Sequence, residues 1–230
     1  MKRIILSIMV LMAADVVTAQ DEGQWSVKPM AGMTVATYTG DDATDSRSSI
    51  GWGGGVEAEY RVNKLLSLDF GLLYTRDRVK SVETLNFKDP TMEFTTDHIR
   101  LTTERMNLPV MLGLHVVPGL TLKAGLQASM LLSAKEKYHV KGFVREVDYD
   151  HMYTTDELAT LPKTPFEKDV TTGVKKELKD LGLEIPLGAS YEWNNVVLDV
   201  RYHFSLLHAA CHTEAYRRYL MLTLGYRLPL

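Results

Sequence analysis

The sequence predicts an all-β fold, an eight-stranded antiparallel up-and-down transmembrane β-barrel, and three observations support this class. First, apolar and polar residues alternate along eight segments, which is the period of a β-strand with one apolar face. Second, these segments are about 10 to 14 residues long, whereas strands of soluble proteins average about 5 or 6 residues and a bilayer needs about 9–11. Third, the connections alternate between short and long, so we expect short periplasmic turns and long external loops.

The composition excludes several other classes of protein. The chain has 230 residues, of which 45% are hydrophobic and 24% are charged, so it is not a disordered chain. Its single Cys excludes a disulfide scaffold, and a net charge of −3 gives no sign of a nucleic-acid partner. Beyond the first 20 residues, no apolar run is long enough for a transmembrane helix.

The N-terminal residues have the order of a secretory signal peptide. Basic residues come first, an apolar stretch covers residues 4–14, and small residues end at Ala19. We expect residues 1–19 to be a cleaved signal peptide and residues 20–230 to form an outer-membrane β-barrel domain. The alternative is a buried N-terminal helix.

The eight predicted strands follow one another along the mature chain. In chain order they are residues 25–37, 51–61, 66–75, 105–116, 120–133, 183–193, 196–205 and 216–228. In each strand every second position is mostly apolar, and we call these positions the apolar parity. It starts at Trp25, Trp52, Leu66, Met106, Leu120, Leu183, Val196 and Tyr216. In 196–205, for example, every even position is apolar, and the odd positions from Asp199 on are polar.

The connections between these strands differ in length. The short ones are Asn63-Lys64, Val117-Pro118-Gly119 and Asn194-Asn195, and the long ones are residues 38–49, 77–98, 135–180 and 206–214. An even number of strands places both ends of the barrel on the side of the short turns. We therefore expect localisation in the outer membrane of a Gram-negative bacterium, with the long loops outside.

The two faces of the predicted strands differ in charge. The polar parity carries both signs of charge, at Glu57, Glu59, Arg61, Asp69, Arg105, Lys123, Glu184, Asp199, Arg201, Arg217 and Arg227. An eight-stranded barrel is just wide enough for side chains to fill it, so we expect these residues to form a polar network in a plugged interior. A proton or ion path is the alternative. The apolar parity then contacts outer-membrane lipid.

Aromatic residues on the apolar parity predict two girdles at the membrane surfaces. Trp52 and Tyr60, like Tyr216 and Tyr226, are spaced so that they lie roughly 20–25 Å apart along the membrane normal. The expected girdle residues are Trp52, Tyr60, Tyr74, Tyr191, Trp193, Tyr202, Tyr216 and Tyr226.

The order of these segments resembles the PorT-like family of small outer-membrane β-barrel proteins of Bacteroidota. The segments that carry the resemblance are Gly53 to Arg61, Leu66 to Tyr74, Met106 to Leu112, Leu122 to Gln127, Asp199 to Tyr202 and Leu224 to Leu228. The resemblance implies the fold and the outer-membrane location, and rarely a defined activity. The namesake branch is linked to protein secretion and gliding, so a subunit of such a complex is an alternative function. The chain departs from the family by ending in Leu228-Pro229-Leu230 rather than in an aromatic residue.

Two groups of residues suggest catalysis or metal binding, but we predict neither activity. His203 and Ser205 have the spacing found in barrels that deacylate lipid A, but their parity is interior, and Leu206 replaces the usual Asn. We therefore expect no enzyme, with a lipid-modifying enzyme as the alternative. His208, Cys211 and His212 are a weak metal-site candidate, because imidazole and thiolate bind zinc or copper. We expect an exposed loop there and no cofactor.

The loop at 135–180 is longer than most loops of compact domains, and loops of this length usually have a function. Thr154 to Glu157 is a capping box that predicts a short helix ended by Pro162, and Thr164 to Glu167 predicts a second helix start. A third amphipathic stretch runs from Val174 to Leu181. The loop could shield the barrel mouth, but contact with a partner such as another envelope or secretion protein is our preferred interpretation.

A periplasmic lipocalin-like carrier is the remaining alternative for the fold of the whole chain.

Overall fold

The computed structural model describes residues 23–40, 46–81, 84–89, 91–147, 153–209 and 215–230. The predicted signal peptide, residues 1–19, lies outside this part of the chain. The elements are β1 (Trp25–Thr39), β2 (Ser46–Arg61), β3 (Leu66–Ser81), β4 (Leu85–Lys88), β5 (Met92–Val117), β6 (Leu120–Arg145), α2 (Thr155–Thr160), β7 (Lys163–Gly173), a 3-10 turn (Lys175–Glu177), β8 (Leu181–Trp193), β9 (Val196–His208), β10 (Tyr216–Tyr226) and β11 (Leu228–Pro229).

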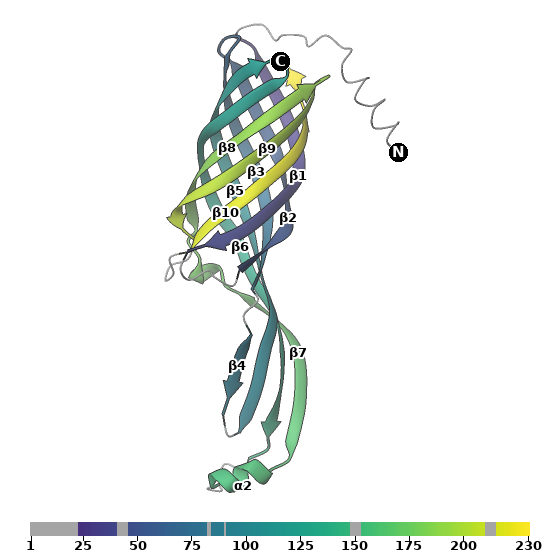
Figure 1. Cartoon of the computed structure of the whole chain (residues 1–230), viewed down its shortest axis with the longest axis vertical. Coiled ribbons are helices and arrows are strands. Elements are labelled where there is room, and N and C mark those ends of the chain that lie inside the picture. Colours follow the sequence, from purple (N-terminus) through teal and green to yellow (C-terminus); the bar gives the residue numbers. More distant parts are fainter. Residues whose placement is uncertain (1–22, 41–45, 82–83, 90, 148–152, 210–214) are drawn as a thin grey trace, which may run out of the picture.

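Eight of these strands form a closed ring, which confirms the predicted fold class. The order around the ring is β5-β3-β2-β1-β10-β9-β8-β6, and the pairing of β5 with β6 closes it. All of these pairings are antiparallel. Figure 1 shows the strands tilted around a common axis. Within the described residues, no helix is long and apolar enough to cross a membrane.

The barrel is mostly polar inside, with one buried apolar cluster that contains Leu73 and Met221, and it is apolar outside. Along β10, for example, Arg217 and Thr223 are buried, whereas Leu220 and Leu224 are exposed on the outer face. This is the reverse of a water-soluble domain, and lipid is the environment that stabilises it. A lipocalin-like carrier would need an apolar interior, so the structure does not fit that alternative.

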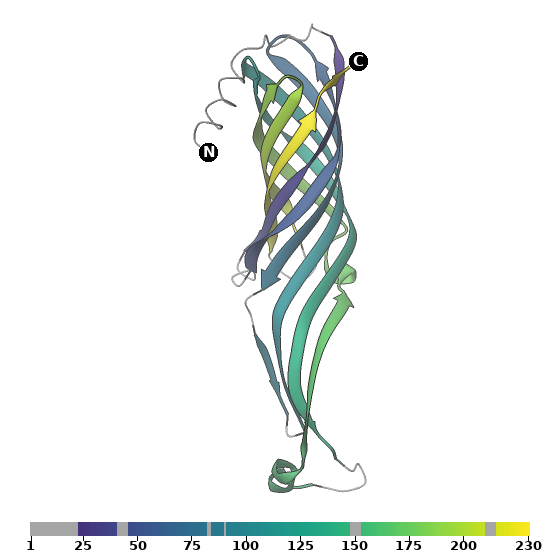
Figure 2. The same ribbon diagram turned by 90° about the vertical axis from the view of Figure 1, so that its right-hand side faces the viewer.

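A second sheet extends beyond one end of the barrel. β5 and β6 have 26 residues each, and their outer parts pair with β4 and β7. We call the four-stranded unit formed by residues 85–88, 92–101, 135–145 and 163–173 the projecting sheet. Figures 1 and 2 show that it continues along the barrel's long direction, with α2 near its tip.

The projecting sheet corrects two predictions. The segments 77–98 and 135–180 are largely strand rather than loop, and Thr164 to Glu167 lies in β7 instead of starting a helix. The reason is long-range pairing. The outer part of β6 has unpaired backbone N–H and C=O groups along one edge, and β7 forms hydrogen bonds with them. The paired residues run from Lys163 opposite Arg145 to Gly173 opposite Lys135. A short isolated helix has no such gain, because helix nucleation is unfavourable.

The capping box in the same segment predicted the local structure correctly. Thr154 caps α2: its Oγ1 accepts a hydrogen bond from the Glu157 backbone N–H, and its own N–H donates to Glu157 Oε2 at 2.8 Å. The helix stops at Thr160, two residues before Pro162. The capping-box helix is therefore confirmed, and the stretch from Val174 contains only a 3-10 turn.

Candidate functional site

The barrel interior holds a first cluster of charges around Arg201 on β9. Its guanidinium donates to both carboxylate oxygens of Glu57, with one contact at 2.8 Å, and its Nε lies 2.6 Å from Asp199. Lys28 approaches the same Glu57 at 3.0 Å. Lys123 extends the cluster, because it lies 3.6 Å from Asp199. It also contacts Asp69, at 2.5 Å.

A second cluster lies nearer the projecting sheet and centres on Arg217 of β10. Arg217 donates to Asp77 and, at 2.6 Å, to Glu184. Gln127 donates to the other oxygen of Glu184 at 2.5 Å and to the Tyr219 hydroxyl at 2.8 Å. The cluster therefore connects strands on opposite sides of the ring.

A third cluster closes the end with the short turns. Arg227 lies 2.6 Å from Glu59 and 3.2 Å from Glu192. Arg61 is only half-buried, unlike the other ten residues of the predicted interior set, which are all buried. Arg105 is one of those ten, and it lines a small cavity of about 10 Å³ together with Glu184 and Arg217.

The buried charges balance. Among the described residues, six acidic and six basic side chains are buried, and the sets are Glu57, Glu59, Asp69, Asp77, Glu184, Asp199 and Lys28, Arg105, Lys123, Arg201, Arg217, Arg227. Burying charge is costly unless it is paired and hydrogen-bonded, so this balance is what allows the interior to fill with charged groups. Sequence reasoning missed Lys28 and Asp77. The first lies on the weakest alternating segment, and the second was assigned to a loop.

The suspected catalytic pair is not assembled. His203 is fully buried, and its ring stacks on Tyr219 with centroids 4.0 Å apart. The Ser205 hydroxyl donates to the Leu207 carbonyl at 2.9 Å instead of to the His203 ring. Activation of a serine needs a base within hydrogen-bond reach, and the Ser205 hydroxyl makes no such contact with His203.

The metal-site candidate is only partly visible. His208 forms a hydrogen bond with the Tyr216 hydroxyl at 2.8 Å, while Cys211 and His212 lie outside the described residues. Within the described part of the chain, no group of three or more His, Cys, Asp and Glu side chains could hold a metal ion.

The predicted girdle residues lie on the outer face of the barrel, half-buried or exposed. Toward the loop end, Trp52 packs against Tyr74 with ring centroids 5.3 Å apart. Near the short turns, Tyr60 packs against Trp25 at 5.0 Å. Tyr191, Trp193 and Tyr226 also lie close to the short-turn end of their strands, whereas Tyr216 lies at the loop end of β10. Tyr202 is the middle residue of β9 and therefore lies at neither end. The prediction omitted Trp25, although it starts the first strand.

The segment 174–180 leads into β8 at the loop end of the barrel. Its backbone is fixed on both sides, by Val174 N–H to the Ala134 carbonyl at 3.1 Å and by Lys179 N–H to the Ala209 carbonyl at 3.0 Å. Val174 packs in a buried cluster with Leu131 and Ala134. The segment therefore links β6 to the end of β9, the two strands that flank β8.

The projecting sheet has one apolar face. Irregularities in the pairing of β5 with β6, at Asp97/Arg100 and Glu104/Arg105, shift the side-chain alternation, so the face that continues the barrel interior changes from polar to apolar. Its apolar residues are Leu85, Phe87, Met92, Phe94, Tyr138, Val140, Val144, Phe166 and Val170. Thr96, Thr164 and Lys168 lie on the same face. Phe87 and Phe94 stack with centroids 5.0 Å apart.

The opposite face of the projecting sheet is charged. His139 on β6 lies between two carboxylates of β7, 2.9 Å from Asp169 and 3.0 Å from Glu167. The hydrogen bond to Asp169, with the charge of Glu167, raises the pKa of His139. Lys137 and His139 together lower the pKa of Asp169 through their hydrogen bonds. Lys141 pairs with Asp97 at 3.3 Å.

Comparison with known proteins is consistent with this architecture. A family model described as the outer membrane protein beta-barrel domain matches residues 18–209. No curated protein matches the chain.

Several solved structures are similar over most of their length. Ail, the attachment invasion locus protein of Yersinia pestis, is 13% identical with a TM-score of 0.40, and the match covers 90% of this chain and 99% of Ail. Neisserial surface protein A is 18% identical with a TM-score of 0.40 and the same two coverages. OprG from Pseudomonas aeruginosa is 11% identical with a TM-score of 0.38, covering 93% of this chain and 99% of OprG.

Proposed function

Because the chain belongs to the outer membrane protein beta-barrel domain family, we propose that it is a non-enzymatic outer-membrane protein that contacts a partner through its projecting sheet. The observation that carries this proposal is the apolar face of that sheet. Leu85 and Phe87 are 51% and 45% exposed there, beyond the band that lipid would cover. Contiguous exposed apolar surface of this kind marks a contact site.

The barrel interior supports an interaction role over a channel. The balanced ion pairs around Arg201, Arg217 and Arg227 occupy the lumen. An open pore needs a water-filled path, which larger barrels provide. We therefore propose a plugged barrel whose task is to anchor and orient the projecting sheet.

The sequence supports a more specific assignment. We infer that residues 1–19 direct export and are removed, and that the chain is PorT-like, on the order of the segments from Gly53 to Leu228. A second candidate function, a subunit of a secretion or gliding complex, is favoured by the same motifs together with a sheet suited to protein contact. The absence of a His203–Ser205 hydrogen bond speaks against the lipid-modifying alternative.

Site-specific photo-crosslinking in intact cells tests the proposal. Val140 and Lys141 are neighbours on β6 whose side chains point to opposite faces of the projecting sheet. A photoreactive residue at Val140 is expected to give a discrete covalent adduct with another protein, and the same residue at Lys141 serves as the matched control. Each variant is first checked for faster gel migration without boiling, which reports a closed barrel. Equal adducts at both positions, or none at Val140, would contradict the proposal.

A further inference from the structure

Four cations form a continuous row across neighbouring strands on the outer surface. The register places Arg47 of β2 opposite Lys80 of β3, Lys80 opposite Arg100 of β5, and Arg100 opposite Lys137 of β6. All four side chains are exposed. Like charges placed directly opposite each other destabilise a sheet, so these cross-strand pairs of cations are unfavourable by themselves.

Partners for these charges are scarce within the described residues. Lys137 lies 3.0 Å from Asp169, whereas Arg47, Lys80 and Arg100 form no ion pair with any other described residue. The adjacent cross-strand row adds Arg78 and Lys135, which are opposite the uncharged Thr102 on β5. We call Arg47, Arg78, Lys80, Arg100, Lys135 and Lys137 the cationic collar.

The collar directly follows the lipid-facing surface. On β3, the parity that exposes Phe70 and Leu72 continues through Tyr74 to Arg78 and Lys80. Four residues of a strand tilted by about 45° rise roughly 9 Å along the membrane normal. If Tyr74 lies at the edge of the hydrocarbon, the Arg78 backbone lies just above the lipid headgroups, which fill roughly the outer 5–8 Å of each leaflet, and Lys80 lies roughly 5 Å higher. The long side chains of Arg and Lys can reach back from there toward the headgroups.

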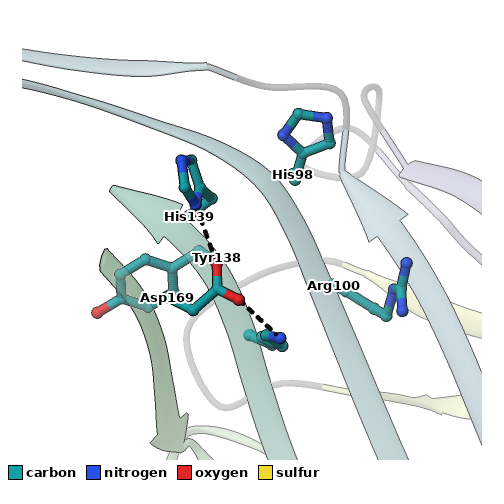
Figure 3. Close-up of a pocket in the computed structure, with 6 residues that line it drawn as sticks. His98, Arg100, Tyr138, His139 and Asp169 are labelled. Carbon is teal, nitrogen blue, oxygen red and sulfur yellow. Dashed lines mark hydrogen bonds and ion pairs between the residues drawn. The ribbon is translucent and has the colours of Figure 1, made fainter. Parts of the chain in front are cut away.

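A pocket in the collar has room for a headgroup. Its volume is about 310 Å³, and it is lined by His98, Arg100, Lys137, Tyr138, His139 and Asp169 (Figure 3). At the irregularity between Asp97 and Arg100, His98 has a φ of 55°, and its ring forms a hydrogen bond with Asp97 at 2.8 Å. Asp169 is the one carboxylate of the lining, and it is already bound to Lys137 and His139, so it leaves the Arg100 guanidinium free.

We propose that the cationic collar binds the phosphate groups of anionic lipid headgroups in the outer leaflet, with Arg100 and Lys137 at its centre. Guanidinium groups bind phosphate oxygens in pairs, and lysines add positive charge along the row. A row of several cations fits lipids that each bring phosphate to the same level of the membrane. A single phosphate ion in solution could engage only one or two of these cations at once.

The test uses the full-length mature protein in a neutral detergent and counts bound lipid by native mass spectrometry. The probes are a bis-phosphorylated glycolipid, phosphatidylcholine and inorganic phosphate. The double variant Lys80→Gln with Arg100→Gln is compared with the control Lys64→Gln with Lys176→Gln, which removes the same charge at exposed positions of a short turn and of the segment 174–180. We expect at least about tenfold weaker glycolipid binding for the first and less than about twofold change for the second.

Several outcomes would overturn the proposal. Equal glycolipid binding by both double variants would remove the collar as the site. Inorganic phosphate or a soluble sulfated polysaccharide that binds the collar more tightly than the glycolipid does would assign it to a soluble anion. If the Lys80→Gln, Arg100→Gln protein does not fold, the unmodified protein still decides: glycolipid binding must weaken as salt rises from 50 to 500 mM, and a salt-independent affinity contradicts an electrostatic site.

Discussion

At the scale of single residues, Arg201 shows how a charged lumen can be stable. Its guanidinium bonds to Glu57 from β2 and to Asp199 from its own strand, while Lys28 supplies a second cation to Glu57. No member of this group is accessible to water. The interior charges could be predicted one by one from alternation, but their pairing could not, because partners such as Arg201 and Glu57 are 144 residues apart in the chain.

Glu57→Gln is expected to destabilise the barrel strongly. The substitution keeps the shape of the side chain but leaves Arg201 and Lys28 with one carboxylate charge fewer, and breaking a buried ion pair from one side costs about 3–5 kcal/mol. The measurement is the urea midpoint of unfolding in lipid or detergent. Glu177→Gln removes an exposed carboxylate and should change the free energy of unfolding by less than about 0.5 kcal/mol. Similar midpoints for the two variants would contradict this account of the lumen.

At the scale of elements, strands were predicted correctly where apolar residues occupy every second position throughout. They were missed where an irregularity in strand pairing shifts this alternation by one residue. The strands of the barrel keep apolar residues on one parity for their whole length within the membrane. In β5 and β6 the irregularities near His98 and Leu132 shift the phase, so the outer halves lose the pattern and resemble loops. β7 has little apolar periodicity of its own, and only the long edge of β6 makes it a strand. The capping box of α2 was predictable because all its contacts are local.

Gly142→Ala tests whether the projecting sheet is a separate structural layer. A Cβ at this position would lie 2.2 Å from the Glu93 carbonyl oxygen and 2.7 Å from the Phe94 Cα, which are backbone atoms of β5 that cannot move aside. We expect a local cost of about 1–3 kcal/mol and faster proteolysis of the projecting sheet, with unboiled gel migration of the barrel unchanged. Gly173→Ala is the matched control, since nothing lies within 4 Å of its Cβ. Loss of the barrel itself would mean that the two parts fold as one unit.

At the scale of the whole molecule, we propose that the barrel anchors the protein and that the projecting sheet makes contact with a partner. The eight-stranded ring was predictable because strand length, face and loop lengths all agree on it. The projecting sheet and the cationic collar were not, because both depend on register across several strands. Arg47, Lys80, Arg100 and Lys137 are scattered over 91 positions of sequence, and only the pairings bring them into one row.

If the lumen is plugged, the protein should not conduct ions across a membrane. Purified protein inserted into a planar bilayer is expected to give no discrete conductance steps, because paired charged side chains fill the cross-section. Replacing residues 174–180 by a flexible glycine-serine linker should not change this, since the clusters around Arg217 and Arg201 lie beneath that segment. Regular steps from the unmodified protein would show a continuous water path and would revive the ion-path alternative.

The length of β5 and β6 also has a mechanical meaning. Each runs without interruption from the short turn at Val117 to the outer part of the projecting sheet, and the two are paired along nearly their whole length (Figure 2). Tension applied near α2 along the barrel axis therefore loads many inter-strand hydrogen bonds at once, in shear, instead of opening them one after another. A tether built this way transmits pulling force from an outside attachment directly into the membrane anchor without an intervening hinge.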